Sequence, residues 1–234
     1  VGLLDKCTFR FSQWDPANPK NKYEGTKEQW DHAQSVMAKI LDDLDVKYDI
    51  GIDEAAFYGP KLDIQYKNVY GKEDTLVTIQ IDMLLAERFG MYYTDENGEK
   101  KLPYIIHRTS LGCYERTLAY LIEHYAGALP TWMAPEQVRF LPVTDRAVDY
   151  CKEQAAKLTA QGYRVTVDTR SEKIGKKIRD AQMEKIPYML IVGDRDIEAG
   201  TVSPRHRADG DLGAMTLDAF TAVLKDVVDN KLQK

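Results

Sequence analysis

Cysteine is scarce in this sequence. The three cysteines, Cys7, Cys113 and Cys151, lie far apart in the chain and form no Cys-x-x-Cys pair. An odd number of widely separated cysteines does not suit a disulfide framework or a cysteine zinc cluster, and it is typical of proteins in a reducing compartment. We therefore expect a cytoplasmic location.

Long apolar runs are also missing. Although 44% of the residues are hydrophobic, no run approaches the ~18 consecutive apolar residues of a membrane-spanning helix. The chain opens on Val1 rather than Met, and its first residues have neither the basic nor the apolar region of a secretion signal. These features predict no membrane partner and a segment that begins inside a longer protein.

Several signatures of catalysis and nucleotide binding are absent. The sequence contains no G-x-x-x-x-G-K-[ST], no G-x-S-x-G, no H-E-x-x-H and no Rossmann glycine pattern. It also shows no internal repeat and no low-complexity tract. Nucleophilic catalysis therefore has no support, and the remaining candidate chemistry is binding by polar and cationic side chains.

Charge is divided unevenly along the chain. Residues 1–133 carry 15 Lys and Arg against 21 Asp and Glu, a net charge of −6, whereas residues 134–234 carry 17 against 16, a net charge of +1. Pro130 and Pro135 bracket a short irregular stretch between these parts, and we place a domain boundary after residue 133. The second part is the one expected to contact nucleic acid.

The first part reads as an antiparallel sheet with a helix. Thr26 and Gln29 form a capping-box pattern that predicts a helix start, with an apolar face extending to Leu44. Apolar and polar residues alternate over 62–67 and 77–82, which predicts two strands that each have one polar face. Such a face is commonly solvated in antiparallel sheets. The functional alternative is a polar floor beneath a ligand.

The segment 104–116 combines a strand pattern with a helix start. Tyr104 to Ile106 form a short apolar run, and from about Ser110 the apolar spacing becomes helical. A helix N-terminus favours anions, and Gly112 allows a ligand to approach the backbone. With Arg116 one turn inside the helix, this segment predicts a phosphate-binding corner.

The second part alternates strands and helices, which predicts an α/β layer structure with a largely parallel sheet. The expected strands are 138–143, 163–167, 188–192 and 201–207, and the expected helices are 145–160, 173–185 and a last helix whose apolar face includes Phe220, Val223 and Val228.

Six motifs together resemble the C-terminal portion of threonyl-tRNA synthetase, a class II aminoacyl-tRNA synthetase. They are Ala56-Phe57-Tyr58-Gly59-Pro60-Lys61, Thr78-Ile79-Gln80-Ile81-Asp82, Ile106-His107-Arg108 with Glu115-Arg116, Tyr125-Ala126-Gly127-Ala128, Glu172-Lys173-Ile174-Gly175 and Pro187-Tyr188-Met189-Leu190. The resemblance implies an α+β fold in which part of an antiparallel class II catalytic domain, 1–133, is followed by an α/β anticodon-binding domain, 134–234.

The resemblance further implies an ATP-dependent reaction. Threonine would be activated to threonyl-adenylate, with ATP bound with Mg²⁺, and then transferred to the 3′ end of threonine tRNA. Arg116 looks like the motif 3 arginine that holds the ATP triphosphate, and Lys61 and Gln80 are similar to family residues near the nucleotide. Tyr58, Gln80 and His107 are similar to residues around threonine.

His107 also matches a zinc ligand of the family, in which Zn²⁺ binds the amino and hydroxyl groups of threonine. The other two zinc ligands, and motifs 1 and 2, precede this segment in the family. We therefore expect the chain alone to bind zinc weakly or not at all and to lack aminoacylation activity. In the full-length protein the resemblance implies a homodimer.

Four residues of the second part match family positions that contact the tRNA anticodon. They are Ser171, Arg179, Asp196 and Arg205. Relatives often carry Asn and Glu in place of Ser171 and Asp196. Arginines that stack on and hydrogen-bond to unstacked loop bases are the expected mode of recognition.

Two alternatives to a threonine ligase remain open on the sequence. One is a non-catalytic tRNA-binding paralogue that lacks class II motifs 1 and 2. The other is a synthetase for proline or histidine, which would share the second-domain architecture. His107 within Ile-His-Arg and the Tyr-Gly-Pro-Lys turn favour threonine over these two amino acids.

Overall fold

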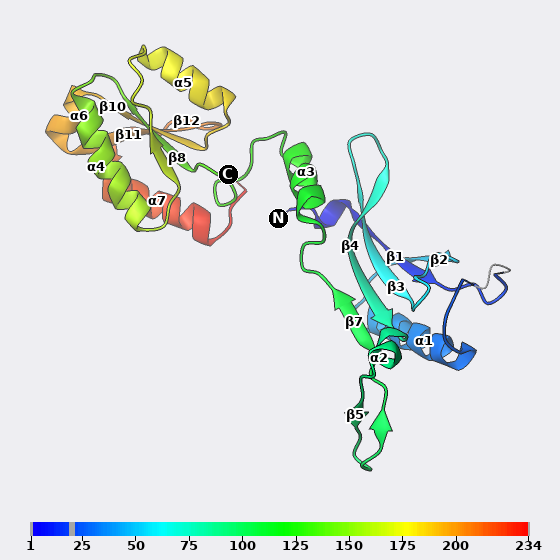
Figure 1. The fold of residues 1–234 in the computed structure, drawn as a ribbon. Helices are drawn as coiled ribbons and strands as arrows, with labels where there is room; N and C mark the ends of the chain where they lie inside the picture. Colours follow the sequence, from blue (N-terminus) through cyan, green and yellow to red (C-terminus); the bar gives the residue numbers. More distant parts are fainter. Residues whose placement is uncertain (1, 19–21, 234) are drawn as a thin grey trace. The chain divides into compact units, whose positions relative to one another are not determined.

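A computed structural model describes residues 2–18 and 22–233 of the chain. These residues form two compact units, Val1–Glu123 and His124–Lys234 (Figure 1). The boundary expected after residue 133 lies further along the chain, in the segment that leads into the first strand of the second unit, and it stays a prediction. No helix of the described chain is long and apolar enough to span a membrane.

The first unit is built on a five-stranded sheet with the order β2-β1-β3-β4-β7. All neighbouring pairs are antiparallel except β1 and β2, so the predicted antiparallel arrangement is confirmed for this unit with one exception. The strands are β1 (Cys7–Gln13), β2 (Asp49–Ile52), β3 (Lys61–Lys67), β4 (Glu73–Asp82) and β7 (Ile105–Arg108), and a short 3-10 helix, Leu4–Lys6, precedes them.

Helix α1 (Lys27–Asp43) closes one face of this sheet. Its predicted capping box is confirmed, with Thr26 accepting a hydrogen bond from the Gln29 N–H. Trp30 of the helix is fully buried in one core with Phe11 of β1. Leu44, predicted to lie on the buried face, is 68% exposed because it follows the last helical turn.

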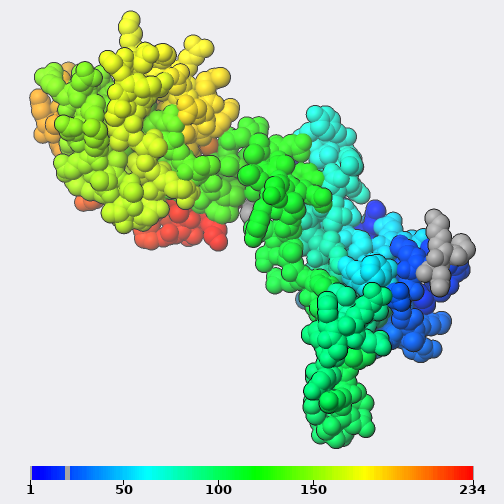
Figure 2. Space-filling model, viewed as in Figure 1, coloured from blue at the N-terminus to red at the C-terminus, as the bar shows by residue number. Residues whose placement is uncertain are grey.

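A hairpin stands out from the rest of the first unit (Figure 2). Its strands are β5 (Tyr93–Thr94) and β6 (Lys100–Lys101), which pair antiparallel around a turn at Asn97-Gly98. The short helix α2 (Leu85–Arg88) precedes it.

Helix α3 (Tyr114–His124) starts later than the sequence pattern predicts. It starts at Tyr114 rather than near Ser110, because the backbone of Gly112 takes a left-handed conformation with φ of +69°. It ends at His124, since Ala126 and Gly127 both have positive φ. The phosphate-binding corner is therefore a loop, residues 109–113, followed by the helix.

The second unit contains a mixed sheet with the order β12-β11-β10-β8-β9, and β13 pairs with β11. The pairs β8–β9 and β8–β10 are parallel, but β11 and its neighbours are antiparallel, so the expectation of a largely parallel sheet is wrong for half of it. The strands are β8 (Val138–Pro142), β9 (Val165–Val167), β10 (Tyr188–Val192), β11 (Thr201–His206), β12 (Gly210–Asp211) and β13 (Met215–Thr216).

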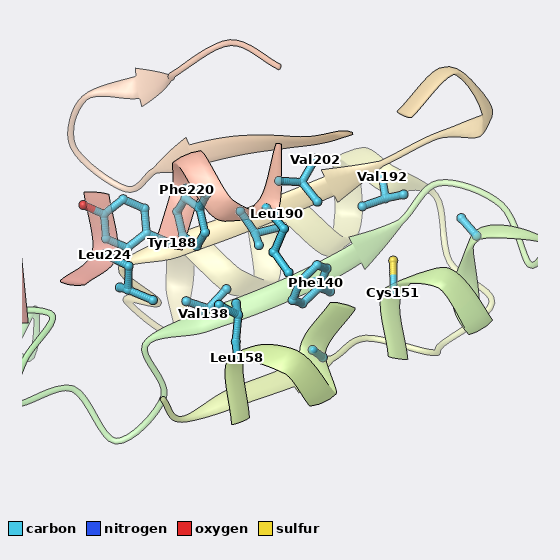
Figure 3. Close-up of a cluster of buried hydrophobic side chains, with 13 residues drawn as sticks. Val138, Phe140, Cys151, Leu158, Tyr188, Leu190, Val192, Val202, Phe220 and Leu224 are labelled. Carbon is cyan, nitrogen blue, oxygen red and sulfur yellow. The ribbon is translucent and has the colours of Figure 1, made fainter. Parts of the chain in front are cut away.

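Helices cover both faces of this sheet. They are α4 (Ala147–Ala160), α5 (Ile174–Met183), α6 (Asp194–Ala199) and α7 (Leu217–Asp229). Phe140 of β8 packs with residues of α4 and α7 in the larger core (Figure 3), whereas its neighbour Leu141 packs with residues of α5. Successive strand residues point to opposite faces, so the unit has three layers. Val223, predicted to lie on the buried face of α7, is 40% exposed.

Candidate active-site floor and RNA-binding unit

Three of the predicted ligand-contacting residues form a row across the sheet of the first unit. Gln80 of β4 lies opposite Lys61 of β3 on one side and opposite His107 of β7 on the other. Residues directly opposite each other in a ladder point to the same face. The register of three strands therefore places all three side chains side by side on one face of the sheet.

Tyr58 joins this row from the turn before β3. Its hydroxyl donates a hydrogen bond to Oε1 of Gln80, and its ring lies edge-on to the His107 ring with centroids 5.9 Å apart. Burial, followed by the nearby charge of Asp82, raises the pKa of the Tyr58 phenol, so the hydroxyl keeps its proton. Gly59 is required beside it, since a Cβ there would lie 1.8 Å from the carbonyl oxygen of Ile81.

A buried carboxylate lies beneath Lys61. Asp63 is 3% exposed and forms an ion pair with the Lys61 ammonium. It also accepts hydrogen bonds from Ser12 Oγ at 2.9 Å and from Thr78 Oγ1 at 2.8 Å. The polar face of β3 is thus not solvated at Asp63. This carboxylate is buried among hydrogen-bond donors and holds the Lys61 side chain in place.

A second buried carboxylate contacts His107. Asp82 is fully buried, and its Oδ2 lies 2.8 Å from Nε2 of His107, while its Oδ1 accepts the backbone N–H groups of Leu84 and Leu85 at 2.9 Å each. Burial opposes ionisation of this carboxyl, but the hydrogen bonds from His107 and the two backbone N–H groups outweigh it and lower the Asp82 pKa.

An open cavity of about 470 Å³ lies over this face. Its lining includes Tyr58, Gln80, His107 and Arg116 among the predicted residues, but Lys61 is not part of it. Nη1 of Arg116 donates to the carbonyl oxygen of Thr75 at 2.5 Å, which ties α3 to β4 at the rim. The cavity therefore brings together four of the five residues predicted to contact threonine or ATP.

The rim also contains a second arginine that the sequence interpretation did not single out as a ligand-contacting residue. Arg108, exposed at the end of β7, lines the same cavity as Arg116. The N–H of Gly112 is already bonded to Thr109 Oγ1 at 3.0 Å, so the two arginines, rather than this backbone group, are the candidate anion-binding groups of the corner.

Asp63 and Asp82 were likewise missed as site residues, although a signal for Asp82 was visible. Asp82 continues the alternating polar face of Thr78 and Gln80, and it lies at the end of a strand just before a turn. For Asp63, the sequence shows a polar residue on an alternating strand. Nothing in the sequence distinguishes a buried carboxylate there from a wet one.

The first unit supplies an incomplete donor set for a zinc ion. A zinc site takes about three protein ligands and an open position. Within residues 2–18 and 22–233, no three His, Cys, Asp or Glu groups are placed to hold one ion. His107 alone does not make up the family's site.

In the second unit, the four predicted anticodon-contacting residues lie on different elements. Ser171 is exposed in the loop between β9 and α5, and Arg179 is exposed on α5. Arg205 lies on β11 half-buried, and its Nε atom is enclosed without a hydrogen-bond partner. Ser171 also lines a cavity of about 450 Å³ with Lys177.

Asp196 differs from the other three residues because both oxygens of its side chain already accept hydrogen bonds within the protein. Oδ2 accepts the N–H of Gly193 at 2.9 Å and so caps α6. Oδ1 accepts the hydroxyls of Ser203 at 2.9 Å and Thr201 at 3.2 Å, which ties α6 to β11. These bonds give Asp196 a structural function in the unit, and its predicted contact with RNA stays a prediction.

Comparison with known families supports the division into two functional parts. The family described as "tRNA synthetase class II core domain (G, H, P, S and T)" matches residues 13–125, and the family described as "Anticodon binding domain" matches residues 137–227. The fold and the polar sheet face thus define a fragment of a class II aminoacyl-tRNA synthetase core followed by an anticodon-binding domain.

Individual relatives identify the family more closely. The chain is 57% identical over 220 residues to a threonine–tRNA ligase of Clostridium perfringens (strain 13 / Type A). The aligned region covers 94% of this chain and 34% of the relative. It is 53% identical over 231 residues to a threonine–tRNA ligase of Clostridium botulinum (strain Eklund 17B / Type B), covering 99% and 36%. The chain belongs to the threonyl-tRNA synthetase family and spans about a third of the length of these curated relatives.

A solved structure agrees with this assignment. The RNA binding domain of threonyl-tRNA synthetase from Cryptosporidium parvum Iowa II superposes with a TM-score of 0.84 at 31% sequence identity. The superposition covers 94% of this chain and 55% of that one. The predicted family and fold class are therefore confirmed.

Proposed function

We propose that this chain is part of a threonine–tRNA ligase that activates threonine with ATP to threonyl-adenylate and transfers it to the 3′ end of threonine tRNA. The observation that carries the proposal is the row of Lys61, Gln80 and His107 across three neighbouring strands, with Tyr58 bonded to Gln80. This row supports the polar floor beneath a ligand, one of the two alternatives that the sequence left open.

In this proposal the two rim arginines bind the phosphates of ATP, which the whole enzyme uses with Mg²⁺. The guanidinium of Arg116 is permanently charged and presents five N–H donors in a planar fork. One of them is engaged by the Thr75 carbonyl oxygen. The bond to Thr75 orients the fork, and the remaining donors are available to stabilise negative charge that develops as pyrophosphate leaves.

The amino acid would lie over Gln80, between Tyr58 and His107. The Tyr58 hydroxyl donates to the Gln80 amide oxygen. The Gln80 –NH₂ group is therefore directed away from Tyr58 and can act as a donor toward a carboxylate or an adenylate oxygen. Because both groups are fixed by one another, they lose little freedom on binding.

The second unit would bind the anticodon of threonine tRNA. Arg179 is exposed on α5 and Arg205 is half-buried on β11, so the accessible guanidinium nitrogens of both can donate to bases of an open loop. Lys173 and Lys176, at the start of the same helix, are exposed and would contact the phosphates.

A chimeric enzyme distinguishes the proposed ligase from a non-catalytic paralogue that only binds tRNA. The matching third of the Clostridium perfringens threonine–tRNA ligase is replaced by this chain, which is 57% identical to it. We expect threonine-dependent ATP–pyrophosphate exchange close to that of the parent enzyme. Replacing Arg116 by Ala in the chimera should reduce exchange by about 100-fold or more, by analogy with the loss of one charge-stabilising donor.

A matched control uses Arg88, an exposed arginine of α2 that does not line the cavity. Arg88→Ala should leave exchange unchanged. A chimera that folds and binds tRNA but shows no exchange would contradict a ligase and support the non-catalytic paralogue.

A further inference from the structure

Asp82 is held in place beside the cavity by hydrogen bonds from the backbone. Its side chain is fully buried, and its Oδ1 accepts two backbone N–H groups from the turn that leads into α2. These two bonds fix the plane of the carboxylate. Its second oxygen, Oδ2, then lies 2.8 Å from Nε2 of His107, on the neighbouring strand.

This geometry decides which nitrogen of His107 carries the proton. An ionised carboxylate is an acceptor only, so the partner atom in a 2.8 Å contact must be the donor. In neutral imidazole only one nitrogen is protonated. With the proton on Nε2, Nδ1 carries the lone pair.

The position of Asp82 in the turn does not by itself require the contact with His107. Oδ1 alone satisfies both N–H groups of the turn. Oδ2 is therefore a separate feature, directed at a ring that lines the cavity and is 42% exposed.

We propose that Asp82 is a positioning residue that holds His107 as its Nε2–H tautomer and thereby offers the Nδ1 lone pair to a hydrogen-bond donor in the cavity. That donor is the ammonium group of an amino acid, because the described residues place no set of three metal ligands around His107. The identity of this ligand rests on the proposed function, but the control of the tautomer does not.

The test is nitrogen NMR of the ¹⁵N-histidine-labelled chain, free of metal, at about pH 8, where an unperturbed imidazole is neutral. Long-range ¹H–¹⁵N spectra distinguish a protonated from an unprotonated ring nitrogen. For His107 we expect a protonated Nε2 and an unprotonated Nδ1. A protonated Nδ1 in the wild-type chain would overturn the proposal without any variant.

Asp82→Asn makes the sharper prediction. The amide oxygen of Asn is the only acceptor that can take up the N–H groups of Leu84 and Leu85, so its –NH₂ donor faces Nε2 of His107. Nε2 must then accept, and the tautomer should invert to Nδ1–H. If Asp82 served only to close the turn, the tautomer would be the same in both proteins.

Asp74→Asn is the matched control, because Asp74 lies on the same strand and accepts a hydrogen bond from Tyr120 but does not contact His107. It should leave the His107 signals unchanged. The signals of the other three histidines, His32, His124 and His206, report whether each variant keeps its fold. Inversion in Asp74→Asn as well would count against a specific effect of Asp82.

Ligand addition separates this inference from the proposed function. Zn²⁺ alone, threonine alone and both together are added to the wild-type chain. A shift confined to Nδ1 with threonine alone identifies the ammonium group, and one with Zn²⁺ alone would identify a metal and contradict the ammonium assignment. If the tautomer inverts as expected but neither ligand shifts Nδ1, the positioning by Asp82 stands and the proposed threonine site of this chain is contradicted.

Discussion

Gly112 lies so close to Leu76 that a Cβ on the glycine would be 1.9 Å from the carbonyl oxygen of Leu76. The glycine also has a φ of +69°. We expect Gly112→Ala to destabilise the first unit by about 3 kcal/mol or more, because the cost of a left-handed alanine, about 1–2 kcal/mol, is added to a backbone clash.

Gly98→Ala isolates the clash. Gly98 has a φ of +79°, but nothing lies within 4 Å of its Cβ position. Gly98→Ala should therefore cost only the free energy of placing an alanine in the left-handed conformation. Urea unfolding followed by fluorescence in a Trp132→Phe background reports on the first unit, since Trp14 and Trp30 then remain. Equal losses for the two variants would show that the Leu76 contact does not matter.

The buried carboxylate of Asp63 should dominate the stability of the polar floor. Asp63→Ala removes the ion-pair partner of Lys61 and the hydrogen-bond acceptor of the Ser12 and Thr78 hydroxyl groups. Breaking a buried ion pair typically costs about 3–5 kcal/mol. Ser12→Ala removes one donor and should cost about 1 kcal/mol. The same fluorescence measurement compares them, and a larger loss for Ser12→Ala would contradict the central position of Asp63.

The second unit should lose stability in acid through Asp168. The side-chain hydrogen bonds from Arg170, against the opposing effect of burial, lower the pKa of Asp168 in the folded chain. A group with a lowered folded pKa stabilises above its unfolded pKa, about 3.9, and this stabilisation is lost as the pH falls through the folded pKa. Its contribution is therefore complete at neutral pH and absent in strong acid.

Asp168→Asn tests this directly. At about pH 7 we expect it to destabilise the unit by about 1–3 kcal/mol, and this difference should shrink toward zero at about pH 2. Urea unfolding followed by the methyl NMR signals of Val138 and Leu141 reports on this unit. A difference that is independent of pH would mean that the charge of Asp168 is not involved.

Zinc content tests whether His107 forms a metal site without further ligands. With one imidazole at the cavity, we expect purified chain to retain well under one equivalent of zinc after dialysis, since a protein zinc site needs about three ligands. His107→Ala should not change the content measured by elemental analysis. Near-stoichiometric zinc that disappears in His107→Ala would show that the chain completes the site by itself.

Alternation and capping patterns were sufficient to predict much of the fold. The capping box at Thr26 and the strands around Ile64 and Ile79 are local features, and all three are confirmed. The predicted start of α3 was wrong because Gly112 has a left-handed backbone and packs closely against Leu76, a residue far from it in the sequence. A periodicity of apolar residues carries no information about such a contact.

The antiparallel half of the second sheet was missed for a related reason. Strand direction depends on how the connection between β10 and β11 folds, and that connection contains the six-residue helix α6, which was not predicted. At the site, the family resemblance identified Gln80 and His107 as candidates. Their positions opposite each other, and the burial of Asp82 beside them, depend on the register between β4 and β7.

The binding of an anticodon stem-loop tests most directly whether this chain is the tRNA-binding part of a threonine–tRNA ligase. Fluorescence anisotropy at low salt compares a threonine-tRNA stem-loop with one of the same stem and altered anticodon bases. Arg179→Ala is compared with Arg195→Ala, which removes another exposed arginine, on α6. We predict tighter binding of the threonine stem-loop, and a loss of about 1–3 kcal/mol for Arg179→Ala alone. Equal affinity for both stem-loops, unchanged in Arg179→Ala, would contradict the account.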